Sequence, residues 1–479
     1  MSASRNFDLP VAVIGGGPVG LAAAAHLVTR GVAVKLYEAG ETVAAHVRDW
    51  SHVRLFSPWR FNTDTAATAI LREHGWQAPA PDALPTGHDL YAAYLAPLAA
   101  APALQGVIET SARVRNVSRH GIDKMVSRAR AEHPFALAID TADGRSRIDR
   151  ARAVIDASGT WSSPNPASAS GTPAIGEITA ADRIAYGIPD VLRRDRAAYA
   201  GHRVLVVGGG HSAANVLLDL ARLAETDTRL QISWAVRGVN LARMFGGGVA
   251  DKLPARGKLG EDLKRLVDSG RLTLVLSFAV EEVARRDDGL LVSERASQPR
   301  VLGPFDRIVV CTGQRPDLSL TRELRLDLDP WLESARALGP MIDPNLHSCG
   351  SVPPHGHREL SHPEPDYFAV GIKSYGRAPT FLMATGYEQV RSVAAHLAGD
   401  DAAANDVHLV LPETGVCSTG LAPSIAAAEG CCGGPAPAEI DACCADDAAA
   451  KAGGEAGCGC ATQEKPAAVA VSCGAKRNG

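Results

Sequence analysis

Two glycine-rich turns contain residue types that can bind a dinucleotide. The first follows an apolar run at residues 11–14 and contains Gly15, Gly17, Pro18 and Gly20. In such a turn the first glycine permits a tight bend, the second lets the backbone approach a pyrophosphate, and the third allows close packing of helix on strand. Glu38 ends the next apolar run, where a carboxylate can accept hydrogen bonds from ribose hydroxyls. This pattern predicts FAD or NAD binding.

The second turn contains Gly208, Gly210, Ser212 and Ala213, and it follows another apolar run. Ala213 takes the third glycine position, which the fingerprint tolerates. The next strand ends in Arg237 instead of an acid, and a guanidinium there suits a 2′-phosphate. We therefore expect NADPH at this turn, with an exposed surface charge as the alternative interpretation of Arg237.

Two dinucleotide sites on one chain predict an enzyme that moves electrons between FAD and NADPH. The options are a disulfide reductase, a monooxygenase and a dehydrogenase with a partner. A disulfide reductase needs a redox dithiol beside the flavin, yet no cysteine precedes Cys311. Cys311 lies in an apolar run with no neighbouring cysteine, so we interpret it as a buried structural thiol. Disulfide reduction is therefore the second hypothesis.

The elements that position these residues alternate in an α/β pattern. Ser158-Gly159 and Thr312-Gly313 each follow a short apolar strand. Such paired segments resemble the hinges of two-dinucleotide flavoproteins, in which the NADPH domain is inserted into the FAD domain. We thus expect two Rossmann-like domains and a disordered Cys-rich tail. The expected boundaries are 1–165 (FAD domain, first part), 166–312 (NADPH domain), 313–400 (FAD domain, second part) and 401–479 (tail).

The last part of the FAD domain is expected to reach the flavin itself. A strand ends at Gly371, and a helix is predicted from about residue 385 to 397 by its apolar spacing. Gly386 near its start would place the helix N-terminus where it stabilises negative charge on a reduced flavin. Val114 matches the position at which a backbone group meets adenine, and it also suits a strand core.

Three segments resemble known flavoproteins: 48–62, 208–215 and 371–391. The layout is similar to the flavin-containing monooxygenase superfamily, and the segments look more narrowly like the flavoprotein monooxygenases of arsenic-resistance operons. The likeness covers about residues 8 to 400. It implies FAD- and NADPH-dependent oxidation of trivalent arsenic (arsenite, methylarsenite) or antimonite to pentavalent species, with dioxygen as co-substrate and a flavin hydroperoxide as oxidant.

The resemblance also implies site residues. Arg48 would lie beside the FAD phosphates or ring, while Trp59 and Asn62 could line the cavity near the reactive flavin carbon. Core packing is the alternative for Trp59. One departure is that no Phe-x-Gly-x-x-x-His-x-x-x-Trp lies between residues 159 and 204. That absence disfavours an amine, ketone or sulfide substrate.

Apart from Cys311 and Cys349, all of the 10 cysteines follow residue 400. Soft thiolates bind thiophilic ions, so the tail is hypothesised to capture metalloid and raise its concentration near the flavin. Structural zinc is disfavoured because Cys-x-x-Cys knuckles are absent. Incidental redox-sensitive cysteines in a disordered tail are the other interpretation. The candidate metalloid ligands are Cys431, Cys432, Cys443, Cys444, Cys458 and Cys460.

Charge and hydropathy limit the classes of partner that the protein is expected to bind. A net charge of −4 and a pI near 6.4 argue against nucleic acid. No apolar run reaches the roughly 18 residues of a membrane span, so a cytoplasmic enzyme is expected.

For His52 and His211 we favour structural or nucleotide-contact roles over a metal site. Two other functions stay open: a dithiol oxidoreductase that uses the tail pairs, and a metalloid-sequestering protein with a relic flavin.

Overall fold

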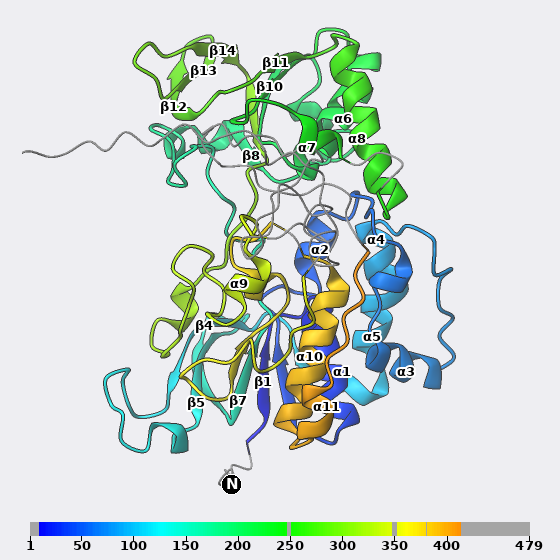
Figure 1. The fold of residues 1–479 in the computed structure, drawn as a ribbon, viewed down its shortest axis with the longest axis vertical. Coiled ribbons are helices and arrows are strands. Elements are labelled where there is room, and N and C mark those ends of the chain that lie inside the picture. The colour runs from blue at the N-terminus through cyan, green and yellow to red at the C-terminus, as the bar shows by residue number, and fades with distance from the viewer. Residues whose placement is uncertain (1–8, 247–250, 347–351, 380, 413–479) are drawn as a thin grey trace, which may run out of the picture. The chain divides into compact units, whose positions relative to one another are not determined.

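The computed structural model describes residues 9–246, 251–346, 352–379 and 381–412. All of them belong to one compact unit, Met1–Thr419. They form two parallel sheets, two antiparallel sheets and the helices that cover them (Figure 1). The predicted tail begins at residue 401; residues 401–412 are described and contain the helix α11 (Asp401–Asn405), whereas residues 413–479 lie outside the described residues.

The first parallel sheet builds the first predicted dinucleotide site. Every residue of β1 is buried, as expected for a parallel strand that is covered on both faces. β16 comes from far along the chain and pairs in parallel with β7. In spatial order the strands are β16 (Tyr367–Ala369), β7 (Ala153–Asp156), β1 (Val11–Ile14), β2 (Val34–Tyr37) and β3 (Ile108–Glu109).

The second parallel sheet lies in the sequence between β7 and β16. The predicted α/β fold, with one Rossmann-like sheet inserted into the other, is therefore confirmed. The strands pair only with strands of their own sheet. In spatial order they are β11 (Thr273–Val275), β10 (Gln231–Ala235), β9 (Arg203–Val207), β15 (Arg307–Val310) and β8 (Ile184–Tyr186).

Two antiparallel sheets accompany the parallel ones, and the sequence analysis did not anticipate them. Their strands carry many exposed charged residues, so they lack the long apolar runs that mark the parallel strands. One sheet is β4 (Arg113–Arg119), β5 (Phe135–Asp140) and β6 (Ser146–Ala151). The other is β12 (Val280–Arg286), β13 (Gly289–Glu294) and β14 (Val301–Phe305).

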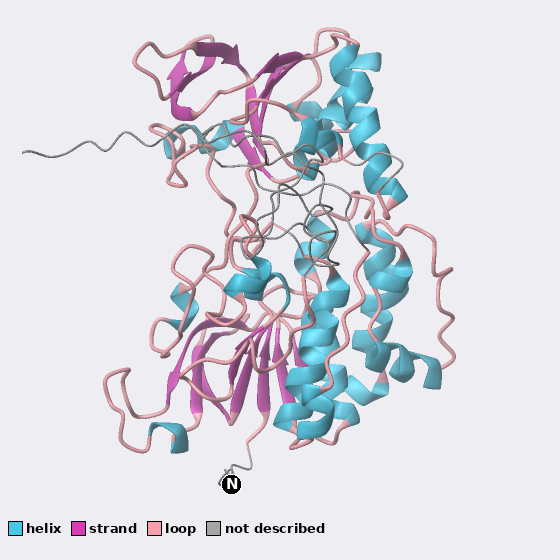
Figure 2. Cartoon of the chain, viewed as in Figure 1, coloured by secondary structure: helices cyan, strands magenta, loops and turns pink. Residues whose placement is uncertain are grey.

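The longer helices pack beside the parallel sheets (Figure 2). α1 begins with Pro18, whose fixed φ suits the first helical position, and nearly all of the helix is buried. α3 is capped by Asp64, which accepts a hydrogen bond from Ala67 N at 2.9 Å. The α-helices are α1 (Pro18–Thr29), α2 (Ala45–Asp49), α3 (Thr65–Glu73), α4 (Gly87–Leu90), α5 (Ala96–Ala100), α6 (His211–Thr226), α7 (Ala242–Phe245), α8 (Pro254–Asp268), α9 (Gly339–Ile342), α10 (Met383–Leu397) and α11 (Asp401–Asn405).

Short helical turns join these elements. They are the 3-10 turns Trp59–Phe61, Pro102–Leu104, Arg130–Glu132, Ile178–Arg183, Arg196–Ala198, Ser319–Thr321 and Gly371–Tyr375, and the π turn Tyr91–Leu95. None of the helices in the described part of the chain is long and apolar enough to span a bilayer.

A buried charge network ties the β4–β6 sheet to the segment that leads into β16. Glu364 is fully buried and accepts hydrogen bonds from Arg119 Nε at 2.7 Å and Arg130 Nη2 at 2.8 Å. The Arg119 guanidinium also lies 3.7 Å from the centre of the Phe135 ring. Because each buried charge has a partner, the network fixes these segments without leaving an uncompensated ion.

Candidate functional site

The turn after β1 has the geometry that a dinucleotide pyrophosphate requires. Gly15 has a φ of +99°, and a Cβ there would lie 2.7 Å from Ala157 O. A Cβ at Gly20 would lie 1.9 Å from Gly15 O. By contrast, a Cβ at Gly17, the N-cap of α1, would meet nothing within 4 Å. The turn is closed against the protein and open where a phosphate would bind, so its residues fit FAD.

Glu38, directly after β2, joins this turn from the side. Its Oε2 accepts a hydrogen bond from Gly16 N at 2.7 Å, and its Oε1 accepts one from Gly40 N at 2.7 Å. A carboxylate has about four acceptor sites, so each oxygen keeps a lone pair for a ribose hydroxyl. The position of Glu38 is thus compatible with its predicted role.

The second turn repeats the geometry of the first. Gly208 has a φ of +135°, and a Cβ there would lie 2.3 Å from Cys311 O. A Cβ at Gly210, the N-cap of α6, would meet nothing within 4 Å. Ser212 and the buried Ala213 follow in the first turn of α6. This turn therefore offers a second cradle for a pyrophosphate at a helix N-terminus.

Arg237 follows β10 at the carboxyl edge of the second sheet. The residue is exposed, and its Nη1 donates a hydrogen bond to Ala169 O at 3.1 Å. Contact with a 2′-phosphate stays a prediction.

The two predicted hinge segments lie side by side. Thr160 Oγ1 donates to Gln314 Oε1 at 3.0 Å. Thr312 Oγ1 donates to Asn165 O at 2.8 Å, and Asn165 N donates to Gly313 O at 2.9 Å. These bonds join the segment after β7 to the segment after β15.

A buried ion pair, which the sequence analysis missed, supports the Ser158–Gly159 turn. Lys373 Nζ donates to Asp156 Oδ2 at 2.7 Å and to Ser158 Oγ at 2.9 Å. Asp156 is fully buried and also accepts from Tyr367 Oη at 3.0 Å; burial raises the pKa of Tyr367. The available signal was an acid in an otherwise apolar strand, which needs a buried partner.

The N-terminus of α10 lies against the first turn of α1. A Cβ at Gly386 would lie 2.6 Å from Val19 Cγ2, and a Cβ at Gly371 would lie 3.2 Å from the same atom. Gly371 has a φ of +67°, and its N–H donates to Gln389 Oε1 at 2.8 Å. The first turn of α10, which begins at Met383 and lacks a side-chain cap, therefore lies beside the first glycine turn, and its contact with a flavin stays a prediction.

The 48–62 segment packs under this first turn. Tyr387 Oη donates to Asn62 O at 2.9 Å. The Asn62 side chain is fully buried and closes its own turn, since Nδ2 donates to Ser57 O at 2.7 Å and to Pro58 O at 3.0 Å. Trp59 is 5% exposed. The structure thus gives Asn62 a turn-forming task, and the predicted cavity role of both residues stays a prediction.

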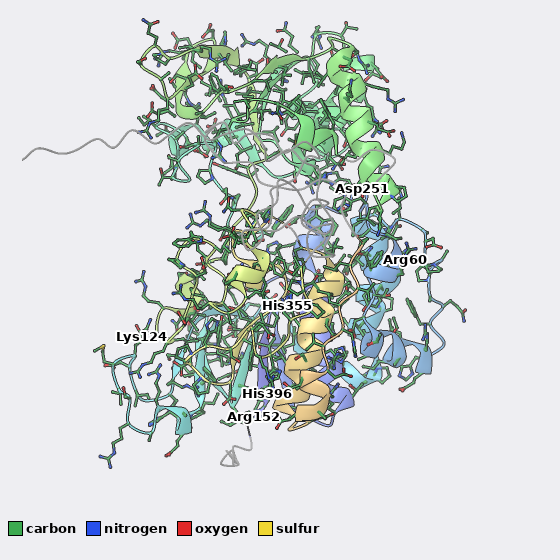
Figure 3. The ribbon with its side chains drawn as sticks, in the orientation of Figure 1. Arg60, Lys124, Arg152, Asp251, His355 and His396 are labelled. Atoms are coloured by element: carbon green, nitrogen blue, oxygen red, sulfur yellow. The ribbon has the colours of Figure 1, made fainter. Side chains whose placement is uncertain are left out.

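The same segment also reaches the second turn. The Phe56 ring lies 5.4 Å from the His211 ring at the start of α6, with Arg256 5.8 Å from the Phe56 centroid. Arg256 is held by Asp251, which is labelled in Figure 3, through two short hydrogen bonds of 2.6 and 2.5 Å. The 48–62 segment therefore contacts both nucleotide-binding halves.

Two further predicted residues lie near the first sheet. Arg48 on α2 is exposed; its Nη1 donates to Thr42 Oγ1 at 2.9 Å, and its guanidinium lies 5.4 Å from the centre of the Tyr91 ring. Val114 pairs with Ile139 in the antiparallel sheet and is half-buried. Neither position tests the predicted contact with FAD.

Cys311 is the only cysteine among the described residues. It is buried, its Sγ donates to Gly187 O at 3.2 Å, and burial raises the pKa of its thiol to about 12. Cys349 and all tail cysteines proposed as metalloid ligands lie outside the described ranges. Within those ranges no cluster of three or more His, Cys, Asp or Glu side chains could hold a metal ion.

Comparisons with known proteins agree with this geometry. A solved bacillithiol disulfide reductase from Bacillus cereus has a TM-score of 0.61 at 17% identity, covering 82% of this chain and 99% of that one. The FAD-bound cadaverine monooxygenase of Erwinia amylovora has a TM-score of 0.57 at 13% identity, covering 86% and 98%. A variant flavin monooxygenase from Stenotrophomonas maltophilia has a TM-score of 0.53 at 22% identity, covering 82% and 98%.

At these identities the solved structures show the fold alone. Among curated protein sequences, no match to this chain is significant. The profile of the pyridine nucleotide-disulphide oxidoreductases matches residues 12–335, more than half of the chain. With its two glycine cradles, the chain therefore belongs to the pyridine nucleotide-disulphide oxidoreductase family and is a flavin-dependent oxidoreductase that uses FAD and NAD(P)H.

Proposed function

We propose that this enzyme is an FAD- and NADPH-dependent monooxygenase that oxidises trivalent arsenicals or antimonite to pentavalent species in metalloid detoxification. The observation that favours dioxygen over a disulfide as electron acceptor is the burial of the Cys311 thiol. Its thiol is buried with a pKa of about 12, and it is the only thiol in the described part of the chain. A thiol of this kind is inert in disulfide exchange, which requires the thiolate. Dioxygen is then the natural electron acceptor.

When bound, FAD supplies the redox chemistry: it accepts two electrons from NADPH and activates dioxygen for transfer of one oxygen atom. The chain's own residues would bind and orient the two nucleotides and shield the flavin from water. Gly17 and Gly210 leave room for the two pyrophosphates. The first turn of α10 would present backbone N–H groups to negative charge on the ring. The buried Trp59 and the turn closed by Asn62 would limit the access of water from the 48–62 side.

The proposal of a metalloid substrate rests on three segments, 48–62, 208–215 and 371–391, which resemble the monooxygenases of arsenic-resistance operons. In the structure these segments meet, because Tyr387 contacts Asn62 and Phe56 contacts His211. A trivalent arsenic or antimony centre carries a lone pair that can accept an oxygen atom directly. No protein base is then required.

The test is turnover by the purified, FAD-loaded, full-length protein with arsenite, methylarsenite and antimonite in turn. We expect at least one of them to accelerate NADPH oxidation and to appear as its pentavalent product in element-specific chromatography. Turnover without any pentavalent product would contradict the proposal.

The tail decides between this proposal and a dithiol oxidoreductase. We propose that Cys431, Cys432, Cys443, Cys444, Cys458 and Cys460 capture metalloid for the flavin. Replacing all six by serine in the full-length chain should raise the KM for the metalloid and leave the maximal rate of oxygen consumption unchanged. A reductase that works through these pairs would instead lose its turnover with a disulfide acceptor.

A further inference from the structure

A small cavity beside the buried ion pair is lined by two oppositely charged residues. Its volume is about 10 Å³, close to the roughly 10–15 Å³ that one water molecule needs. Glu333 and Lys373 both line it, together with Tyr367, His362 and Ser374. A site with several polar groups and room for one water normally contains that water.

Glu333 presents an oxygen that requires a partner. Its Oε1 forms an ion pair with Arg315 Nη2. Its Oε2 is buried and has no hydrogen-bond partner among the described residues. A buried carboxylate oxygen without a partner carries the full cost of desolvation, so such atoms in native proteins usually contact an ordered water or ion.

Lys373 presents the complementary donor. Its ammonium group has three N–H donors. Two of them are used, one toward Asp156 Oδ2 and one toward Ser158 Oγ. With the side chain only 2% exposed, the third donor has to find an acceptor inside the protein.

The backbones that carry the two charges are locked together. A Cβ at Gly376 would lie 1.9 Å from Leu332 O, and Arg377 N donates to the same oxygen at 2.6 Å. Glu333 itself has a φ of +61°, a left-handed conformation that a non-glycine residue adopts only when its surroundings impose it. The turn at Glu333 is therefore held against the turn that carries Lys373.

We propose that one ordered water occupies this cavity, donating to Glu333 Oε2 and accepting from Lys373 Nζ. Glu333 is then a positioning residue for the ammonium group, which lies beneath the Ser158–Gly159 turn. The proposal rests on FAD lying along that turn, as family membership indicates, and on no particular substrate. Together the two charges set the electrostatic potential at the flavin.

The reduction potential of bound FAD measures this effect directly. It is obtained anaerobically by equilibration with a reference dye, without metalloid, so that it does not depend on the proposed substrate. Glu333→Gln removes a negative charge and should favour the reduced flavin by about tenfold in the reduced-to-oxidised ratio, or about 30 mV for a two-electron couple. Lys373→Met removes a positive charge and should shift the ratio in the opposite direction.

Shifts of the reduction potential in opposite directions in Glu333→Gln and Lys373→Met distinguish an electrostatic role from a packing role. Glu333→Gly removes the charge and relieves the left-handed backbone at the loss of the ion pair with Arg315, so it should favour the reduced flavin as Glu333→Gln does, whatever its melting temperature. The matched control is Glu132→Gln, at an exposed carboxylate, which should change neither. An unchanged potential in Glu333→Gln would overturn the proposal. If Lys373→Met does not retain FAD, the reduction potential of Glu333→Gln is by itself the test of the proposal.

A crystal structure of the FAD-loaded enzyme at high resolution provides the second readout. We expect one water within hydrogen-bond distance of both Glu333 Oε2 and Lys373 Nζ, absent or displaced in Glu333→Gly. A dry cavity in the wild-type enzyme would contradict the proposal, whatever the activity toward metalloids.

Discussion

At the scale of single residues, Asp156 is the acceptor on which the buried Lys373 ammonium depends. Asp156→Ala removes the direct carboxylate partner of that buried charge, so we expect the free energy of unfolding to fall by about 3–5 kcal/mol. Urea unfolding of the FAD-loaded protein measures it. The double variant Asp156→Ala/Lys373→Met should lose clearly less. Equal losses in the single and the double variant would show that the charge is not the cause.

Arg237 is the residue that we propose to select NADPH over NADH. Removing one charge-assisted contact costs about 1.5–3 kcal/mol, so Arg237→Ala should raise the KM for NADPH by roughly 10- to 100-fold and leave that for NADH nearly unchanged. Steady-state kinetics with both nucleotides checks this. Arg229→Ala, at an exposed arginine paired with Asp227, is the matched control. An equal effect on both nucleotides would assign the 2′-phosphate contact elsewhere.

At the scale of elements, the first strand–turn–helix unit contains a glycine needed for binding, Gly17, and a glycine needed for packing, Gly20. A Cβ at position 17 meets nothing within 4 Å, so Gly17→Val should fold normally and lose FAD affinity by at least about 100-fold, or roughly 2.7 kcal/mol. A valine at position 20 collides with Gly15 O, so Gly20→Val should lose the packing of α1. Circular dichroism and FAD fluorescence titration distinguish the two. A normal FAD affinity in Gly17→Val would exclude this turn as the pyrophosphate site.

The segment that packs along α10 contains buried histidines whose protonation should destabilise the fold at low pH. Burial lowers the pKa values of His355, His357 and His362, and the His357 ring stacks 4.5 Å from that of His396 (Figure 3 labels His355 and His396). Because the folded-state pKa values lie below the unfolded value of about 6.5, this contribution to stability is complete above pH 6.5 and is lost as the pH falls below it.

The melting temperature should accordingly be lower at pH 5.5 than at pH 7.5. His357→Gln should reduce the difference, whereas His74→Gln, at an exposed histidine, should not. A pH dependence that is identical in wild type and His357→Gln would contradict the assignment.

At the scale of the whole molecule, the sequence predicts what short-range patterns encode. Apolar runs that lead into glycine turns locate β1 and β9, and with them both cradles and the insertion of one sheet into the other. Contacts between distant residues leave no such pattern. Asp156 and Lys373 are 217 positions apart, and Arg119 lies 245 positions from Glu364. The charged antiparallel strands and the left-handed Glu333 likewise follow from tertiary packing.

We propose that electrons from NADPH pass through FAD to dioxygen, with one oxygen atom transferred to a trivalent metalloid. The most direct test records dioxygen and NADPH together while the FAD-loaded full-length enzyme turns over methylarsenite, arsenite or antimonite. We expect one NADPH and one dioxygen to be consumed per pentavalent product. Metalloid-independent NADPH oxidation that proceeds equally well without dioxygen, with electrons recovered in a disulfide acceptor, would contradict it.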